Sequence, residues 1–295
     1  MRVGDKMPKK KEKDPAKKSE KKSGFGRRMI KEFNSYVEGR PRKVVVTYIV
    51  LRVLVLLTLV HQAIIGNYYN AMLCVLTLLL FMIPAFADRK LNVSLPSLLE
   101  VIILLFAFSA EILGEIQNFY GIIHSWDTML HTLNGFMMAA IGFALIDVLN
   151  NNPKFHFTAS PVFVGFVAFC FSMTVGVVWE FFEFFMESFF RIDMQRDFIY
   201  NTITTTNRVI NPSGDNSAVI VENVRSAVTG TVNGVKQTFS YDGYLDIGIK
   251  DTMKDLMVNC LGAVVFSVLG VFYIKGRGRF AAKFMPTLKT DDENN

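Results

Sequence analysis

Residues 69–87 read YNAMLCVLTLLLFMIPAFA and contain no Asp, Glu, Lys or Arg. As a helix rising about 1.5 Å per residue, this stretch nearly crosses a hydrocarbon core of about 30 Å. Its apolar residues are continuous rather than alternating, which is typical of a membrane-spanning helix and not of a barrel strand. The run therefore indicates an integral membrane protein.

Five further hydrophobic stretches have the same character, in a chain of 295 residues that is 51% hydrophobic. The six predicted spans are residues 44–66, 69–87, 97–117, 127–149, 161–187 and 251–274. Each span should be a helix, because the bilayer core offers no water to backbone polar groups. The sequence thus predicts an all-α polytopic membrane protein, built as a bundle of six transmembrane helices.

The charge of the chain is unevenly distributed. Residues 1–43 hold 16 Lys/Arg and 6 Asp/Glu, a balance of +10, so the remaining residues sum to −4. A basic tail followed by an acidic membrane body argues against a nucleic-acid-binding protein. The tail has the composition of a disordered cytoplasmic arm. Its basic residues should also be attracted to anionic lipid head groups, by about 1 kcal/mol each near the surface, which makes membrane lipids predicted partners.

Basic residues also predict the orientation of the chain. Five of them crowd the start of the first span: Arg27, Arg28, Arg40, Arg42 and Lys43. The positive-inside rule places this amino terminus in the cytoplasm, and six crossings return the carboxyl terminus to the same side. The predicted organisation is a basic cytoplasmic tail (1–43), five helices (44–187), an extracytoplasmic insert (188–250), a sixth helix (251–275) and a cytoplasmic tail (276–295).

The predicted insert, residues 188–250, is rich in Thr, Asn, Val and Gly. Ala218-Val219-Ile220-Val221 has the composition of a strand, and Asn233-Gly234 between β-branched residues is a strong hairpin signal. We therefore expect a small β-rich insert outside the membrane, with a partner in the cell envelope as its candidate ligand.

Acidic and histidine side chains end or begin four of the spans. They are Glu111 with Glu115, Asp127 with His131, Glu180 with Glu183 and Glu187, and Asp251 with Asp255 and Asn259. Ionisable groups at membrane depth are costly, so they are functional candidates by default. The orientation deduced from Lys and Arg places all four groups at the outer ends of their helices.

Within each span, the spacing places these residues on one helix face, since positions three and four apart are neighbours. Glu111 and Glu115 extend to Asn118, and Asp127 and His131 extend to Asn134. If the faces converge, they form an acidic cup with His131 on its wall. The six residues predicted to lie deepest in the membrane are the candidate catalytic set. The residues nearer the surface are expected to contact water as a wetted rim: Glu111, Glu115, Glu187 and Asp251. The six are Asp127, His131, Glu180, Glu183, Asp255 and Asn259.

Several of these runs resemble the signature of a known family. They are Trp126-Asp127-Thr128-Met129-Leu130-His131, Trp179-Glu180-Phe181-Phe182-Glu183, Met194-Gln195, and Asp251-Thr252-Met253-Lys254-Asp255-Leu256 with Asn259 and Gly262. Over about residues 44–275 the chain resembles the YjdF-like family of uncharacterised bacterial inner-membrane proteins, and more distantly the VanZ-like proteins. The resemblance implies a six-helix fold in a bacterial cytoplasmic membrane. It supplies no activity, and the long insert after Gln195 departs from the short family members.

Three kinds of function fit the polar residues. One is a membrane enzyme or accessory factor acting on a lipid-linked or cell-envelope substrate, with His131 as general acid or base, since an unperturbed histidine has a pKa of about 6.5. Another is binding of a divalent cation by His131, Glu180, Glu183 and Asp255. The third is a structural or assembly role without catalysis. The sequence has no HExxH or GxSxG motif that would identify a reaction.

Overall fold

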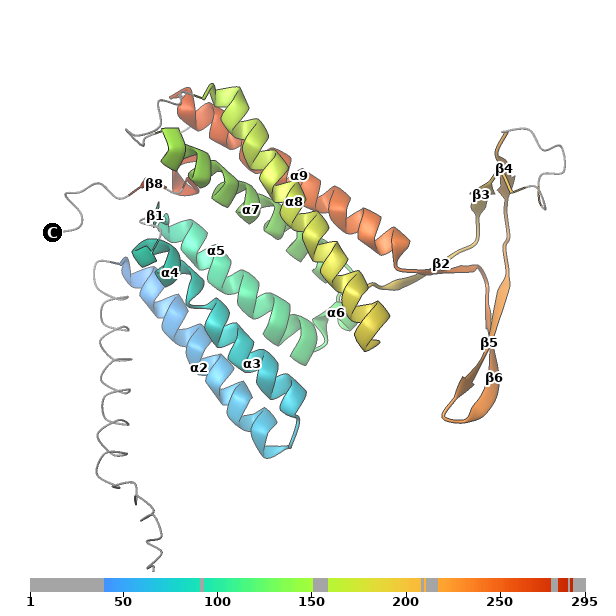
Figure 1. The fold of residues 1–295 in the computed structure, drawn as a ribbon. Coiled ribbons are helices and arrows are strands. Elements are labelled where there is room, and N and C mark those ends of the chain that lie inside the picture. The colour runs from blue at the N-terminus through green and yellow to red at the C-terminus, as the bar shows by residue number, and fades with distance from the viewer. Residues whose placement is uncertain are drawn as a thin grey trace, which may run out of the picture.

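The computed structural model describes residues 40–90, 93–150, 159–207, 210, 217–276, 281–285 and 287–288. Most of the predicted basic tail lies outside these residues. Six helices in the described chain are long and apolar enough to cross a membrane, as predicted (Figure 1). They are α2 (Arg42–Ile64), α3 (Tyr68–Leu80) with α4 (Ile83–Lys90), α5 (Ser97–Phe108) with η1 (Ser109–Ile116), α7 (Trp126–Asn150), α8 (Pro161–Phe185) with η2 (Met186–Phe190), and α9 (Ile249–Ile274).

The second span is broken, whereas residues 69–87 are expected to form one helix. The last turn of α3 tightens, so that the Met82 amide donates to the Leu79 carbonyl at 2.9 Å. The cause is Pro84, which has no amide hydrogen to donate to Leu80 and whose ring would collide with that carbonyl. The chain resumes as α4 in the same direction, and Tyr68–Ala87 still counts as one apolar span.

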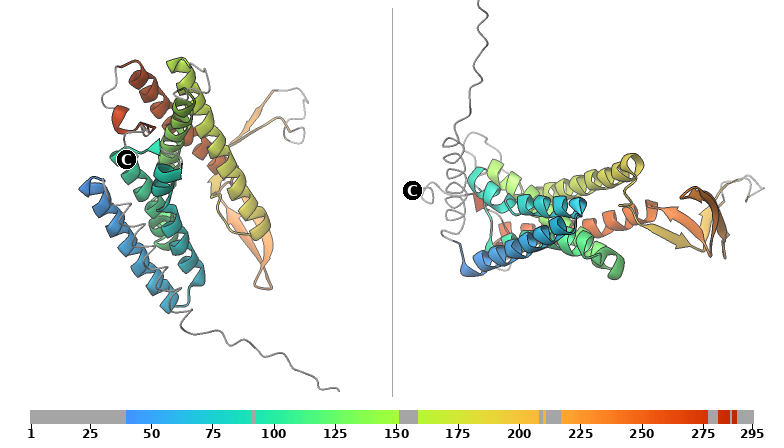
Figure 2. Two further views of the ribbon diagram at one scale, coloured as in Figure 1. Left: turned by 60° about the vertical axis from the view of Figure 1, so that its left-hand side comes forward. Right: turned by 90° about the horizontal axis from the view of Figure 1, so that it is seen from below.

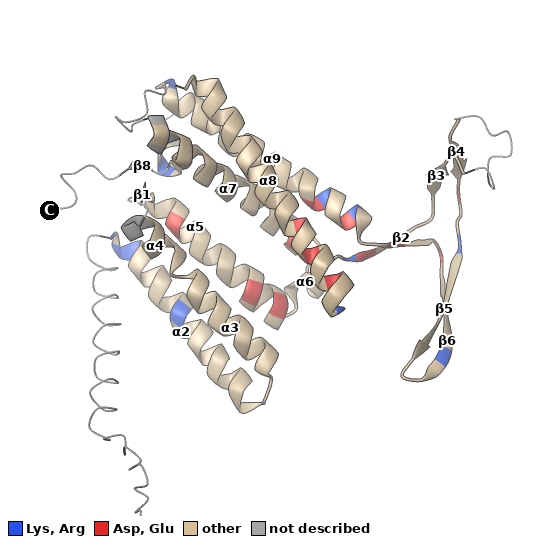
Figure 3. Ribbon diagram, viewed as in Figure 1, with Lys and Arg blue, Asp and Glu red and all other residues tan. Residues whose placement is uncertain are grey.

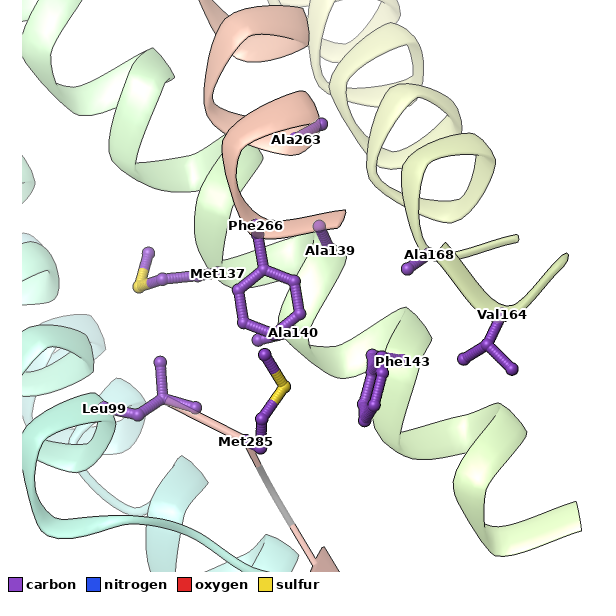
Figure 4. Close-up of a cluster of buried hydrophobic side chains, with 10 residues drawn as sticks. All are labelled: Leu99, Met137, Ala139, Ala140, Phe143, Val164, Ala168, Ala263, Phe266 and Met285. Atoms are coloured by element: carbon purple, nitrogen blue, oxygen red, sulfur yellow. The ribbon is translucent and has the colours of Figure 1, made fainter. Parts of the chain in front are cut away.

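Two hydrophobic clusters hold the helices together. One lies among α7, α8, α9 and the start of α5, with Phe143 and Phe266 at its centre (Figure 4). The other joins α2, α3 and the far half of α5 through Tyr48, Val55 and Leu104. Because α5 contributes to both clusters, it connects the pair α2–α3 to the three-helix group α7–α8–α9.

The backbones of α7 and α9 approach closely at two glycines. A side chain at Gly135 would collide with the carbonyl of Asn259, and one at Gly262 would collide with the carbonyl of Thr132. Small residues permit this kind of approach between membrane helices. The contact brings the polar faces of α7 and α9 within reach of each other.

The carboxyl-terminal segment folds back onto the bundle. Residues 276–295 are expected to form a tail, but Met285 is only 1% exposed and belongs to the cluster around Phe266. Nearby, β8 (Thr287–Leu288) pairs antiparallel with β1 (Val93–Ser94). This contact lies at the end of the bundle opposite the insert (Figure 1).

The insert is β-rich, as predicted, and its described residues form three antiparallel strand pairs. Strand β2 (Asp197–Tyr200) pairs with β7 (Tyr244–Ile247), β3 (Ile203–Thr205) with β4 (Val219–Val221), and β5 (Ser226–Val232) with β6 (Val235–Tyr241). The predicted hairpin turn is confirmed, since Asn233 and Gly234 have φ values of 51° and 80°. The strands extend beyond the helices as an arm (Figure 2).

Candidate functional site

The acidic positions of η1, α8 and α9 gather at the end of the bundle from which the strands leave (Figure 3). Asp127 lies in the first turn of α7, and Asp251 in the first turn of α9. Glu180 and Glu183 occupy the last turns of α8. The helix directions therefore bring polar ends that are distant in sequence to one level.

His131 is the centre of this group. Its Nε2 lies 3.4 Å from Asp127 Oδ1 and 4.0 Å from Asp255 Oδ2. Its Nδ1 lies 3.7 Å from Glu180 Oε1. All four side chains are buried, and they come from α7, α8 and α9. The imidazole is thus surrounded by three carboxylates from three helices.

Lys254 brings a positive charge into the same group. Its Nζ lies 3.2 Å from Asp251 Oδ1, 3.5 Å from Asp255 Oδ1 and 3.7 Å from Asp127 Oδ2. Lys254 is absent from the predicted site residues, because a lysine near a helix end is usually explained by its reach to the membrane surface. The signal in the sequence is its position between Asp251 and Asp255, which places its stem beside both.

Two carboxylate oxygens of the group lack a hydrogen-bond donor. Within the described chain, these are Oδ2 of Asp127 and Oδ1 of Asp255. Buried acceptors are normally satisfied, and leaving a buried carboxylate without a partner is costly. The group therefore has unused capacity to bind a cation.

Asp127, His131 and Asp255 lie close enough together to share one cation. Each offers one ligand atom, and the three atoms lie within 4.8 Å of one another. Two carboxylates and one imidazole are a mixed oxygen and nitrogen set that suits divalent cations such as Mn²⁺. Glu180 lies on the other side of the imidazole, 3.7 Å from Nδ1, where its carboxylate can accept the ring N–H and orient His131.

Two of the predicted residues have other partners. Glu183 is buried, but its Oε1 accepts a 2.7 Å hydrogen bond from Trp179 Nε1 on the same helix. Asn259 lies deeper, where its Oδ1 accepts a 3.1 Å hydrogen bond from Asn134 Nδ2. Its amide fits against Gly176 of α8, where a side chain would leave only 2.7 Å to Nδ2. Asn259 thus joins the three helices beneath the group around His131.

The fourth polar group does not reach His131 directly. Glu111 and Glu115 lie on η1, a π-helical segment, which is a rare form often found at functional sites. Asn118 does not continue their face as expected, because the helix ends before it and Asn118 adopts a left-handed conformation with φ 57°. Three of the four groups therefore converge.

Tyr120 and Arg196 lie between the acids of η1 and the group around His131. The Tyr120 ring fills the space beside Gly114 of η1, and the Arg196 guanidinium lies 5.3 Å from the centre of that ring. Burial raises the pKa of the Tyr120 phenol, and the charges of Asp127 and Glu115 raise it further. Neither residue is predicted from the sequence, because no spacing rule relates them to the spans.

Asp251 is buried rather than part of a wetted rim, since it is only 2% exposed. Its Oδ2 accepts a 3.0 Å hydrogen bond from the backbone amide of Arg196, the residue before β2. Beside it, Gln195 Nε2 donates to Thr252 Oγ1 at 2.6 Å. The base of the insert is thus bonded to the first turn of α9, whereas Glu115 is exposed as expected.

Comparison with known proteins gives a family for the chain. Residues 45–276 match the model of a family described as "Predicted membrane protein (DUF2238)". The chain belongs to this family. The description states a membrane location and no activity, and it carries neither the YjdF-like nor the VanZ-like name. No curated protein and no solved structure matches the chain.

Proposed function

We propose that this membrane protein binds a divalent cation through Asp127, His131 and Asp255, with Glu180 orienting the imidazole from its other ring nitrogen. The observation that carries the proposal is the convergence of three ligand atoms within 4.8 Å on buried side chains from two helices. Within the described residues, Oδ2 of Asp127 and Oδ1 of Asp255 have no hydrogen-bond donor, which adds to it. A cation there would link α7 to α9 at the end that carries the insert, with Glu180 of α8 beside the imidazole.

A purely structural network explains these residues less well. Hydrogen bonds between membrane helices are worth only about 0.6 kcal/mol on average. A buried charge without a partner is strongly destabilising by comparison. Lys254 is one ammonium near three carboxylates, and within the described residues Asp127 Oδ2 and Asp255 Oδ1 remain without a hydrogen-bond donor. A bound divalent cation supplies the missing positive charge.

Titration of Mn²⁺ into the purified full-length protein, followed by electron paramagnetic resonance of the free ion, tests the proposal. We expect one saturable site, with affinity lowered at least tenfold by Asp255→Asn and by His131→Ala. Asp242→Asn is the matched control, because Asp242 is an exposed acid of the insert whose one ion pair among the described residues is with exposed Arg225 at 3.6 Å. At a concentration of 100 times Kd, binding should stabilise the fold by about 2.7 kcal/mol. Absence of stoichiometric Mn²⁺ together with an unchanged melting temperature would refute the proposal.

We place the protein in the bacterial cytoplasmic membrane, with both termini in the cytoplasm and the site facing outward. The support is the excess of Lys and Arg in residues 1–43. In this orientation the insert is available to a partner in the cell envelope. A reporter fused between Asn233 and Gly234 should be active only outside the cell, and a cytoplasmic signal would reverse the orientation.

A second candidate function is acid–base chemistry on a lipid-linked or cell-envelope substrate. It is favoured by the contacts of His131, whose two ring nitrogens face Asp127 and Glu180. The contacts narrow the candidate catalytic residues to these three and Asp255, because Glu183 and Asn259 have other partners. A His131→Gln variant that binds Mn²⁺ weakly but retains a wild-type envelope phenotype would count against this function.

A further inference from the structure

We infer that Lys254 is a tethered counter-ion that occupies part of the cation site, so that a metal ion binds only by displacing its ammonium group. The inference rests on the proposed cation site and assigns the residue that controls its occupancy and selectivity. It concerns a residue that no motif in the sequence singles out.

The ammonium group of Lys254 lies close to two of the proposed ligands. Lys254 Nζ lies 3.5 Å from Asp255 Oδ1 and 3.7 Å from Asp127 Oδ2. These two oxygens belong to ligands of the proposed site, and neither has a hydrogen-bond partner within the described chain. The ammonium is therefore near enough to compensate their charge without satisfying them as acceptors. A cation held by the same two carboxylates would experience direct repulsion from Lys254.

The side chain is also free to leave. It is 33% exposed, whereas the side chain of Asp255 is 1% exposed. Lysine carries its charge on a flexible four-carbon stem, so the ammonium can move while the helix remains fixed. Its Nζ lies 5.7 Å from the centre of the Phe198 ring on β2, and an aromatic face can stabilise a cation. Phe198 is thus already near the ammonium and remains available to it when it moves off the carboxylates.

Displacement has a consequence for selectivity. Exchange of an ammonium for a monovalent cation leaves the charge of the group unchanged, whereas exchange for a divalent cation adds one positive charge. Several buried carboxylates surround this point, so the extra charge is favourable. Lys254 should therefore weaken binding of every cation while favouring divalent over monovalent ions.

The first test compares Mn²⁺ affinity in three variants of the full-length protein. Lys254→Met, which retains the length of the side chain without its charge, should bind Mn²⁺ at least tenfold more tightly than the wild type. Lys254→Arg should remain weak, because it retains the charge. Lys250→Met is the control on the same helix, since the Lys250 ammonium lies 5.5 Å from the Tyr200 ring centre and no carboxylate contact of its side chain is seen within the described residues.

The same titrations, repeated with NaCl held high, report selectivity. Sodium should compete with Mn²⁺ more strongly in Lys254→Met than in the wild type. If the wild type binds Mn²⁺ and Lys254→Met binds it no more tightly, the inference fails while the cation site stands. If neither protein binds Mn²⁺, both the site and the inference are overturned.

A second measurement uses the wild-type chain and does not depend on a variant that folds. A water-soluble amine-acylating reagent should modify Lys254 faster when Mn²⁺ is saturating, because the displaced ammonium is no longer held by carboxylates. Lys250 serves as the internal reference in the same mass-spectrometric experiment. A several-fold increase at Lys254 alone supports displacement, and equal rates with and without bound Mn²⁺ exclude it.

Discussion

Replacement of Gly262 by alanine should separate two helices and weaken the cation site together. The nearest atoms to an added Cβ are the carbonyl oxygen of Thr132 and, at 2.9 Å, the backbone nitrogen of Phe136. Both belong to the α7 backbone, which cannot rotate away as a side chain would. The strain must therefore be relieved by moving α7 and α9 apart.

The expected cost follows from the rigidity of this contact. Insertion of a methyl group into a well-packed interior typically costs about 1–3 kcal/mol. That range corresponds to a fall in Tm of roughly 2–5 °C for a chain of 295 residues. The distance of 4.0 Å between His131 Nε2 and Asp255 Oδ2 spans the same two helices, so it should lengthen as well. We expect Mn²⁺ affinity to fall about tenfold.

Thermal unfolding and Mn²⁺ titration of the same preparation measure the two effects. Gly230→Ala is the matched control, because Gly230 lies on β5 with open space where its Cβ would be. A Gly262→Ala protein with wild-type Tm would show that the backbones of α7 and α9 are not in contact. A lower Tm with unchanged Mn²⁺ affinity would show that this contact does not set the ligand spacing.

Two further predictions concern residues outside the site. Met285→Ala should lower the free energy of unfolding by about 2–5 kcal/mol, because Met285 is buried against Phe266 and Leu99 and its truncation should leave a cavity. A denaturant titration measures this change. An unchanged free energy of unfolding would mean that the carboxyl-terminal segment does not fold back onto the bundle. The raised pKa of Tyr120 means that the folded state binds the phenolic proton more tightly than the unfolded state. Stability should therefore fall as the pH rises above the ordinary tyrosine value of about 10, and it should fall less in Tyr120→Phe. Equal pH dependence of unfolding in the two proteins would contradict the burial of the phenol.

The number and type of the helices could be predicted from the sequence, because each is a local property. A membrane helix satisfies its backbone hydrogen bonds internally, so its length and apolar composition suffice to indicate it. The hairpin at Asn233-Gly234 is local for a similar reason, since positive φ values at two adjacent residues favour Asn and Gly. The break before Pro84 also has a local cause, although the uninterrupted apolar run masks it.

Which residues come together in the site depends on the tertiary structure. Helical spacing predicts that Asp127 and His131 share a face, but it cannot predict that this face meets Asp255 and Glu180 rather than Glu111 and Glu115. That outcome depends on how each helix is rotated about its axis and on where backbones can approach, which Gly135 and Gly262 decide between α7 and α9.

Local sequence signals establish a six-helix membrane protein with acidic and histidine residues at the ends of its spans and a β-rich insert. The packing of the helices places His131 among three carboxylates, brings Lys254 close enough to neutralise part of their charge, and buries Asp251 beneath the insert. The difference is one of distance. Hydrophobicity and turn propensity act within a few residues, whereas a cation site requires atoms from separate helices to meet within a few ångströms.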